Sequence, residues 1–305
     1  MSDRFCLEIA GVHFTVQCRQ ASVLPDPWEC YRTFRTQAGP SPGMIPATLE
    51  IEVGNVPDVS HATKVFEGES WALYSEGDSV FIALAPRPGG LPPAWIARMS
   101  PDFTTGTVYC DEILVRDNDG VSGIVNPILH RLDQLLVMYL LASREGLIVH
   151  SAGAVLNAKG LVFAGRSGAG KSTISRLLRD HANPARTKLL SDDRTVIRRI
   201  GHDYLVYGTP WAGDAQIGLN DCAPLKELYF LQHALEDRLE PLSPREAAQA
   251  LFPVASIPWY DRHLVEQATE FCEQIVTHIP VFNLHFKPDA DVVSLLEGVP
   301  RCGAS

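Results

Sequence analysis

A glycine-rich stretch between two apolar segments constrains this chain more than any other feature. In residues 161–178, LVFAGRSGAGKSTISRLL, four residues separate Gly165 from Gly170, Lys171 and Ser172, which matches the phosphate-binding loop pattern G-x-x-x-x-G-K-[ST]. The apolar residues before the loop predict a short buried strand, and apolar residues at helical spacing after it predict a helix. Strand, glycine-rich turn and helix therefore follow in the order that the pattern requires.

The composition of this loop points to a phosphate ligand. Backbone N–H groups at a helix N-terminus, where glycine permits close approach, form a cradle for a polyphosphate. Lys171 would supply a point charge for the β- and γ-phosphates, and the Ser172 hydroxyl would hold Mg²⁺. The alternative is a flexible turn that carries a solvated lysine. The predicted phosphate-binding residues are Gly165, Arg166, Ser167, Gly168, Ala169, Gly170, Lys171, Ser172 and Thr173.

Length, charge and cysteine content bound the class of protein. A chain of 305 residues, 46% of them hydrophobic, is long enough for a proper core in one large domain or two. The net charge of −10, without a cluster of Lys and Arg, argues against nucleic acid as the main partner. No apolar run approaches the roughly 18 residues of a membrane helix or suggests a signal peptide. We therefore expect a soluble protein without a membrane partner.

The seven cysteines are scattered, odd in number and without C-x-x-C spacing. This pattern argues against a disulfide framework and against a zinc site, and it favours a reducing, cytoplasmic compartment. A monomer and a homo-oligomer both stay open.

The sequence pattern changes near residue 125. Residues 1–125 contain alternating strand patterns and predict a β-rich domain for substrate recognition or regulation. From Val125 to Ala142 apolar residues recur at a period of 3.6, which predicts a packed helix with Pro127 in its first turn. We place the boundary just before this helix, so residues 126–305 form a second domain that contains the loop.

A tight antiparallel hairpin leads into the loop. Residues 147–156, LIVHSAGAVL, predict a strand that carries His150, and residues 157–160 predict the turn. A single histidine on a strand is otherwise read as a satisfied core residue, so a functional role for His150 depends on its surroundings.

Two adjacent carboxylates follow the loop helix. Residues 188–193, KLLSDD, predict a strand that ends in Asp192 and Asp193, and we expect it to neighbour the loop strand and to present both acids beside the phosphates. Adjacent side chains point to opposite faces of a regular strand. One acid would therefore hold Mg²⁺ and the other would reach a substrate hydroxyl, and which is which stays open. The alternative is a solvated strand end or a helix cap.

The remaining chain is read as alternating elements. The irregular segment GTPWAGD is interpreted either as a substrate contact or as a plain turn. The predicted strands are a hairpin at residues 195–207 and single strands at 223–231 and 280–286. Three helices are predicted: one that begins after Ser243, with Glu246 as its capping partner, and two more at 262–277 and 291–296.

Together these segments resemble the HPr kinase/phosphorylase family. The resemblance rests on IVHSAGAVLNAKGLVFAG, GRSGAGKST, LLSDDRTVI, GTPWAGD and PVFNLHFKPD, and it covers roughly residues 126–298. It implies an α/β fold of the phosphoenolpyruvate carboxykinase type, with a P-loop kinase core and a mixed sheet, preceded by a smaller β-rich domain. It also implies ATP or another phosphate donor, Mg²⁺ held by Ser172 with Asp192 or Asp193, the other aspartate as base, and His150 next to the phosphates.

The chain departs from HPr kinases after the aspartates, where GTPWAGD replaces the glycine-rich segment that engages HPr. In this respect it is similar to the HPr kinase-like branch of biosynthetic clusters, some members of which phosphorylate peptides. The resulting hypothesis is an ATP- and Mg²⁺-dependent kinase whose catalytic residues are Asp192, Asp193, His150 and Lys171. Its acceptor would be a Ser or Thr of a peptide or small protein, or a small metabolite. The competing hypothesis is a nucleotide-binding regulatory module, which needs a metal carboxylate but no base.

Overall fold

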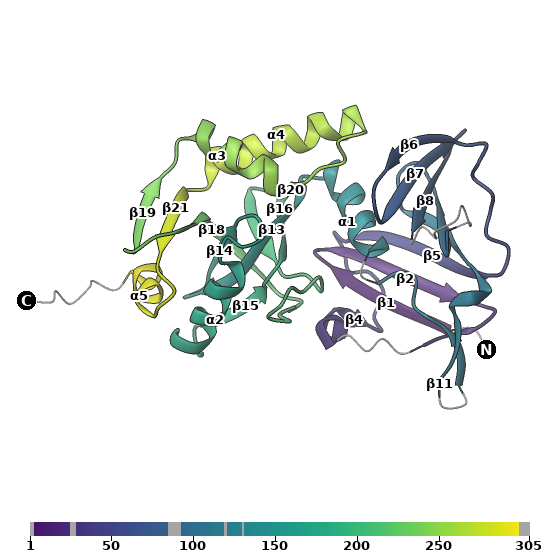
Figure 1. Cartoon of the computed structure of the whole chain (residues 1–305), viewed down its shortest axis with the longest axis horizontal. Coiled ribbons are helices and arrows are strands. Elements are labelled where there is room, and N and C mark those ends of the chain that lie inside the picture. Colours follow the sequence, from purple (N-terminus) through teal and green to yellow (C-terminus); the bar gives the residue numbers. More distant parts are fainter. Residues whose placement is uncertain (1–2, 25–28, 85–92, 119–120, 130, 299–305) are drawn as a thin grey trace, which may run out of the picture. The chain divides into compact units, whose positions relative to one another are not determined.

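The computed structural model describes residues 3–24, 29–84, 93–118, 121–129 and 131–298 (Figure 1). It is a mixed α/β structure with large mixed sheets and, in these residues, few helices. The chain forms two compact units, of which the first comprises Met1–Glu29 and Arg35–Leu140 and the second Cys30–Phe34 and Leu141–Ser305. The division thus falls after Leu140, whereas the change of sequence pattern falls near residue 125.

The first unit is built mainly on one mixed sheet. In the described residues its strands are β1 (Asp3–Ile9), β2 (Val12–Cys18), β4 (Arg35–Thr36), β5 (Ile45–Val53), β6 (Thr63–Glu67), β7 (Trp71–Glu76), β8 (Ser79–Leu84), β9 (Trp95–Met99) and β10 (Thr105–Cys110). They lie in the order β4-β1-β2-β5-β10-β9-β8-β7-β6, and β5 runs parallel to both of its neighbours. Buried and exposed residues alternate along β5, so one face of the sheet packs into the core. A smaller sheet joins β11 (Val115–Asn118), β12 (Val121–Ile124) and β3 (Ser22–Val23).

The helix predicted from Val125 begins later than expected. Helix α1 spans Leu132–Ala142, so Pro127 lies outside it and its placement in the first turn was wrong. The side chain of Asn126 accepts a hydrogen bond from the Ile128 backbone N–H at 3.0 Å, which favours a turn over a helix. Ile128 is fully buried. The apolar pattern therefore extends past the helix because buried residues outside the helix contribute to it.

The second unit contains a mixed sheet that closes on itself. In the described residues its strands are β13 (Gly146–Leu156), β14 (Lys159–Ala164), β15 (Thr187–Ser191), β16 (Arg194–Ile200), β17 (Asp203–Tyr207), β18 (Cys222–His233), β19 (Arg238–Pro241), β20 (Ala255–Ser256) and β21 (Val281–Phe286). The main order is β14-β13-β16-β17-β18-β21-β19, and β18 also pairs with β14 in parallel. The predicted hairpin before the loop is confirmed, since β13 and β14 are antiparallel and Asn157 and Ala158 turn with φ of 51° and 63°.

The strand that precedes the two aspartates is not a neighbour of the loop strand. β15 pairs with β13, and β13 uses its other edge to pair with β14. β13 therefore separates the two strands, which corrects the expectation that they are adjacent. The hairpin connection accounts for this difference, because it places β13 beside β14 before β15 is added.

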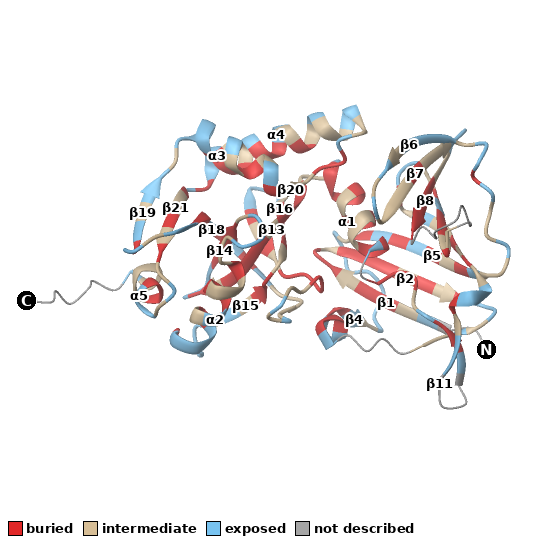
Figure 2. Ribbon diagram, in the orientation of Figure 1, coloured by how far each residue is buried: buried red, intermediate tan, exposed pale blue. Residues whose placement is uncertain are grey.

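Helices cover both faces of this second sheet (Figure 1). They are α2 (Lys171–His181), α3 (Pro244–Leu251), α4 (Arg262–His278) and α5 (Asp291–Glu297). Apolar residues of α3 and α4 share one buried cluster with the strands, and those of α2 and α5 share another. Figure 2 accordingly shows buried residues along the strands and on the helix sides turned toward them. Among the described residues, no helix combines the length and the apolar character needed to cross a bilayer.

A short stretch from the N-terminal part of the chain belongs to the second unit. Residues Cys30–Phe34 lie in the 3-10 helix η1 (Glu29–Phe34), and Tyr31 and Phe34 are fully buried. The Thr33 hydroxyl accepts a hydrogen bond from the Asn220 backbone N–H at 3.0 Å. This stretch is therefore part of the packing around the segment that follows β17.

The predicted capping box of α3 is confirmed. Ser243 accepts a hydrogen bond from the Glu246 backbone N–H, and the Glu246 carboxylate accepts from the Ser243 backbone N–H at 3.0 Å. We expect Ser243→Ala to lower the free energy of unfolding by about 1 kcal/mol, because the Glu246 backbone N–H loses its side-chain acceptor. Urea unfolding followed by fluorescence measures this change. Glu246→Gln keeps a side-chain acceptor and should cost less, and equal losses in both variants would contradict the capping role.

Candidate functional site

The phosphate-binding loop pattern connects β14 to α2, which confirms the predicted order of strand, loop and helix. Gly168 and Gly170 adopt φ of 81° and 104°, in the left-handed region that side chains rarely enter. A Cβ on Gly165 would come within 2.5 Å of the Ala169 Cβ. The loop therefore needs glycine at all three positions for its tight backbone path.

The N-terminus of α2 is open to an anion. Gly170 occupies the N-cap position and provides no side-chain acceptor for the first-turn amides. Those amides and the positive end of the helix dipole together favour a negatively charged ligand. The backbone at the start of α2 is therefore suited to bind an anion, as the sequence pattern predicted.

A cavity of about 450 Å³ lies against this loop. Among the predicted site residues, it is lined by His150, Ser167, Gly168, residues 170–173 and Asp193. Gly165, Arg166, Ala169 and Asp192 are not among its lining residues. The structure therefore gathers most of the loop, one histidine and one of the two predicted acids around one space.

Lys171 lines this cavity and is largely buried. Its side chain is only 7% exposed, and its ammonium group donates to the carbonyl oxygens of Gly165 and Arg166 at 3.2 and 3.4 Å. Burial lowers the pKa of Lys171 below the ordinary value for lysine, and the Asp193 carboxylate counteracts this effect. A bound phosphate would supply a further negative charge near a lysine that the loop already orients.

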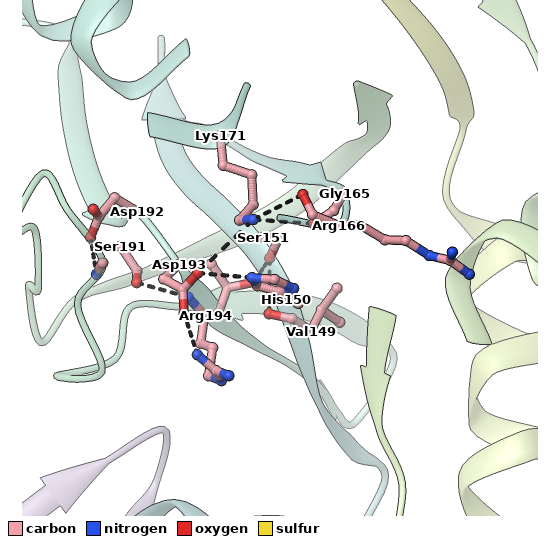
Figure 3. A network of polar contacts seen from close by, with 12 residues as sticks. Val149, His150, Ser151, Gly165, Arg166, Lys171, Ser191, Asp192, Asp193 and Arg194 are labelled. Carbon is pink, nitrogen blue, oxygen red and sulfur yellow. Dashed lines mark hydrogen bonds and ion pairs between the residues drawn. The ribbon is translucent and has the colours of Figure 1, made fainter. Parts of the chain in front are cut away.

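Asp193 is the centre of a charged cluster (Figure 3). One carboxylate oxygen lies 2.8 Å from His150 Nε2 and 3.9 Å from Lys171 Nζ, and the other accepts a hydrogen bond from the Arg194 guanidinium. Burial by itself would raise the pKa of Asp193. The hydrogen bond from His150 and the charges of Arg194, His150 and Lys171 outweigh burial and hold that pKa below its usual range. Asp193 therefore faces the cavity as an ionised carboxylate.

Asp192 has a different environment from Asp193. It is 1% exposed, and its carboxylate accepts backbone N–H groups of Gly213 at 2.9 Å, Ala215 at 2.7 Å and Ile217 at 3.2 Å. Figure 3 shows it apart from the cluster around Asp193. Of the two acids that were expected beside the phosphates, only Asp193 lines the cavity, because Asp192 accepts hydrogen bonds from the segment after β17.

Gly213, Asp214 and His233 also line the cavity. Sequence reasoning missed His233, and it had marked the segment of the other two, GTPWAGD, as either a substrate contact or a plain turn. The His233 ring contacts the Gly168 carbonyl oxygen, with Nε2 at 3.0 Å. His233 ends β18, which is parallel to β14, so both strands finish at the same edge of the sheet. Asp214 lies in GTPWAGD, a segment whose composition marked it as irregular. Composition thus pointed to the segment that carries Asp214, whereas His233 is selected only by the sheet order, which places the end of β18 beside the end of β14.

A family model described as "ScmC: SynChlorMet cassette protein ScmC" matches residues 126–286. No curated protein matches the chain. Among solved structures, the Hpr(Ser) kinase/phosphatase from Coxiella burnetii is similar at 10% identity, over 50% of this chain and 88% of that chain, with a TM-score of 0.29. That score is too low to establish a shared fold, so the kinase-type core stays a prediction.

Proposed function

This chain belongs to the ScmC family of SynChlorMet cassette proteins, and we propose that it is an ATP- and Mg²⁺-dependent phosphotransferase of the HPr kinase type. The observation that carries this proposal is the convergence of Lys171, His150 and Asp193 at a cavity beside the open N-terminus of α2. The glycine-rich loop offers amides for phosphate oxygens, the lysine offers a positive charge, and the aspartate offers a proton acceptor. Phosphoryl transfer needs little more from a protein than such positioning and charge compensation.

Each residue has one role in the proposed reaction. The loop amides and Lys171 bind the phosphate oxygens and compensate the negative charge that develops on them. As the bond between the γ-phosphorus and its bridging oxygen breaks, the acceptor oxygen bonds to that phosphorus and its proton passes to Asp193. His150 orients the Asp193 carboxylate through the contact of 2.8 Å. The products are the phosphorylated acceptor and ADP.

The donor groups of the cavity suit a hard divalent cation. Ser172 offers a hydroxyl oxygen, Asp193 and Asp214 offer carboxylate oxygens, and the lining contains no thiol, which matches the preference of Mg²⁺ for oxygen ligands. Ser172, at the start of α2, and one carboxylate would hold the ion. When bound, it would neutralise charge on the transferring phosphoryl group.

Two carboxylates at the cavity favour a kinase over a regulatory nucleotide sensor. A sensor needs one carboxylate for a metal ion and has no use for a base. Asp192 is not the second carboxylate at the cavity, but Asp214 lines the cavity together with Asp193. One acid is therefore available for the cation and another for the proton of the acceptor.

The acceptor that we propose is a hydroxyl of a peptide or small protein, with a small metabolite as the other class. The description of the family as a cassette protein directs the search toward products of neighbouring genes. In the proposal, residues 1–125 contribute to recognition of the acceptor. The described cysteines form no disulfide, which is compatible with a cytoplasmic setting.

Mass spectrometry of candidate acceptors tests this function. We expect one product of a neighbouring gene, incubated with the protein, ATP and Mg²⁺, to gain the mass of one phosphoryl group on a Ser or Thr. Omission of Mg²⁺ is the matched control and should abolish the gain. Tight ATP binding without transfer to any product of a neighbouring gene, and without transfer to small hydroxyl compounds, would favour the regulatory module instead.

A further inference from the structure

The buried carboxylate of Asp192 organises the segment that follows β17. Three backbone N–H groups from residues 213–217 converge on its two oxygens at 2.7 to 3.2 Å. Hydrogen bonds to an ionised carboxylate are stronger than those between neutral groups. A buried carboxylate also needs such partners to offset its lost hydration. Asp192 and this backbone segment therefore stabilise one another.

Further contacts fix the same segment against the ends of β15 and β16. The Leu219 N–H donates to the Leu190 carbonyl at 2.9 Å, and the Thr209 hydroxyl donates to the Arg194 carbonyl at 2.5 Å. A Cβ on Gly213 would lie 3.0 Å from an Asp192 carboxylate oxygen. The backbone at Gly213 thus passes close to the aspartate pair, and the next residue, Asp214, lines the cavity.

The two carboxylates that line the cavity differ in how their charge is compensated. Asp193 contacts Lys171, Arg194 and His150. Asp214 makes no hydrogen bond or ion pair with another part of the chain that the structure describes. A divalent cation beside Asp193 would meet the like charges of Lys171 and Arg194, which oppose its binding. Asp214, whose charge no neighbouring cation of the described chain compensates, is therefore the better ligand for the divalent cation.

We propose that Asp214, together with Ser172, holds the divalent cation, and that Asp192 is a positioning residue that acts through the loop carrying Asp214. This inference rests on the proposed function, because it concerns the cation that accompanies the phosphate donor. It gives the metal-binding role, which the sequence left open between Asp192 and Asp193, to Asp214, a residue that was not among the predicted metal ligands. It also leaves Asp193 free to accept the proton of the acceptor hydroxyl.

Metal and nucleotide binding test the inference without any acceptor. Binding of Mn²⁺ to the protein with ATP is measured by electron paramagnetic resonance, and binding of ATP in the presence of EDTA is measured by calorimetry. We expect Asp214→Asn to weaken Mn²⁺ binding by at least about 10- to 100-fold, the range found when even outer partners of a metal site are changed. Metal-free ATP affinity should stay within about twofold of the parent. Asp203→Asn, at the exposed first residue of β17, is the matched control and should leave both values unchanged.

A second variant tests the positioning role. Asp192→Asn should weaken Mn²⁺ binding by about 10- to 100-fold and should accelerate hydrogen exchange at the Gly213, Ala215 and Ile217 amides. Asp214→Asn should leave these amides protected. Weaker Mn²⁺ binding in Asp192→Asn with these amides still protected would overturn the positioning role.

The outcomes separate this inference from the proposed function. Parent-like Mn²⁺ binding by Asp214→Asn, in a protein that binds ATP, overturns the inference and leaves the proposed function standing. Absence of ATP binding by the parent protein overturns both. Because Asp214 is exposed, its variant is expected to fold, so the result does not depend on the stability of Asp192→Asn.

Discussion

Purified Lys171→Ala protein is expected to lose phosphoryl transfer by a factor of about 10² to 10³, comparable to removal of one oxyanion donor from an active site. Lys171 lines the cavity, and its ammonium group is oriented by the Gly165 and Arg166 carbonyl oxygens. Its loss leaves the developing charge on the phosphate oxygens with the amides and the cation alone. Transfer of labelled phosphate from ATP to the acceptor measures the effect.

Two comparisons make this result interpretable. Lys171→Met keeps most of the side-chain volume of the buried lysine and should lose activity to the same extent, which separates lost charge from a packing defect. Lys159→Ala changes an exposed lysine at the start of β14 and should retain full activity. Near-normal turnover of Lys171→Ala at saturating ATP and Mg²⁺ would refute the assignment of Lys171.

The second large effect is expected for Asp193→Asn. Removal of the proton acceptor should lower the turnover number by about 10² to 10⁴, the range typical of general base catalysis. Nucleotide affinity should be retained or increased, because Lys171 and Arg194 lose an anionic neighbour and meet the phosphates with less compensated charge. Steady-state kinetics together with calorimetric titration of ATP separate the two quantities.

The direction of the change in affinity decides between roles for Asp193. A metal ligand would lose affinity for Mg²⁺ with ATP when changed to asparagine, whereas a base would lose only turnover. Asp203→Asn again serves as the matched control. A variant that binds and reacts like the parent would show that the cluster around Asp193 is structural.

Local signals predicted much of the second unit correctly. The loop pattern, the hairpin before it and the capping box of α3 depend on residues close together in sequence, and the structure has all three. The start of α1 was placed too early, because burial of Ile128 outside the helix continues the apolar period that normally marks one. A 3.6-residue period of apolar residues indicates which residues are buried, and it indicates a helix only indirectly.

The non-local part of the site could not be predicted in the same way. Alternation along a strand separates Asp192 from Asp193, but it does not say which of them faces the cavity. Which acid faces the cavity depends on Gly213, Ala215 and Ile217. Their backbone N–H groups, more than twenty residues along the chain, donate hydrogen bonds to the Asp192 carboxylate. These contacts are made by the backbone, so the side chains of the segment carry almost no signal for them.

The stretch Cys30–Phe34 has a consequence for how this protein can be dissected and synthesised. Because the chain enters the second unit, leaves it and returns, no single cut yields two complete halves. A fragment that begins at residue 126 would lack Tyr31 and Phe34 and would expose the apolar surface that they cover. On the ribosome, this stretch emerges more than a hundred residues before the rest of the second unit, so the second unit can complete its core only late in synthesis. Separate expression of the unit would therefore require the missing helix to be supplied as a peptide or fused to the fragment.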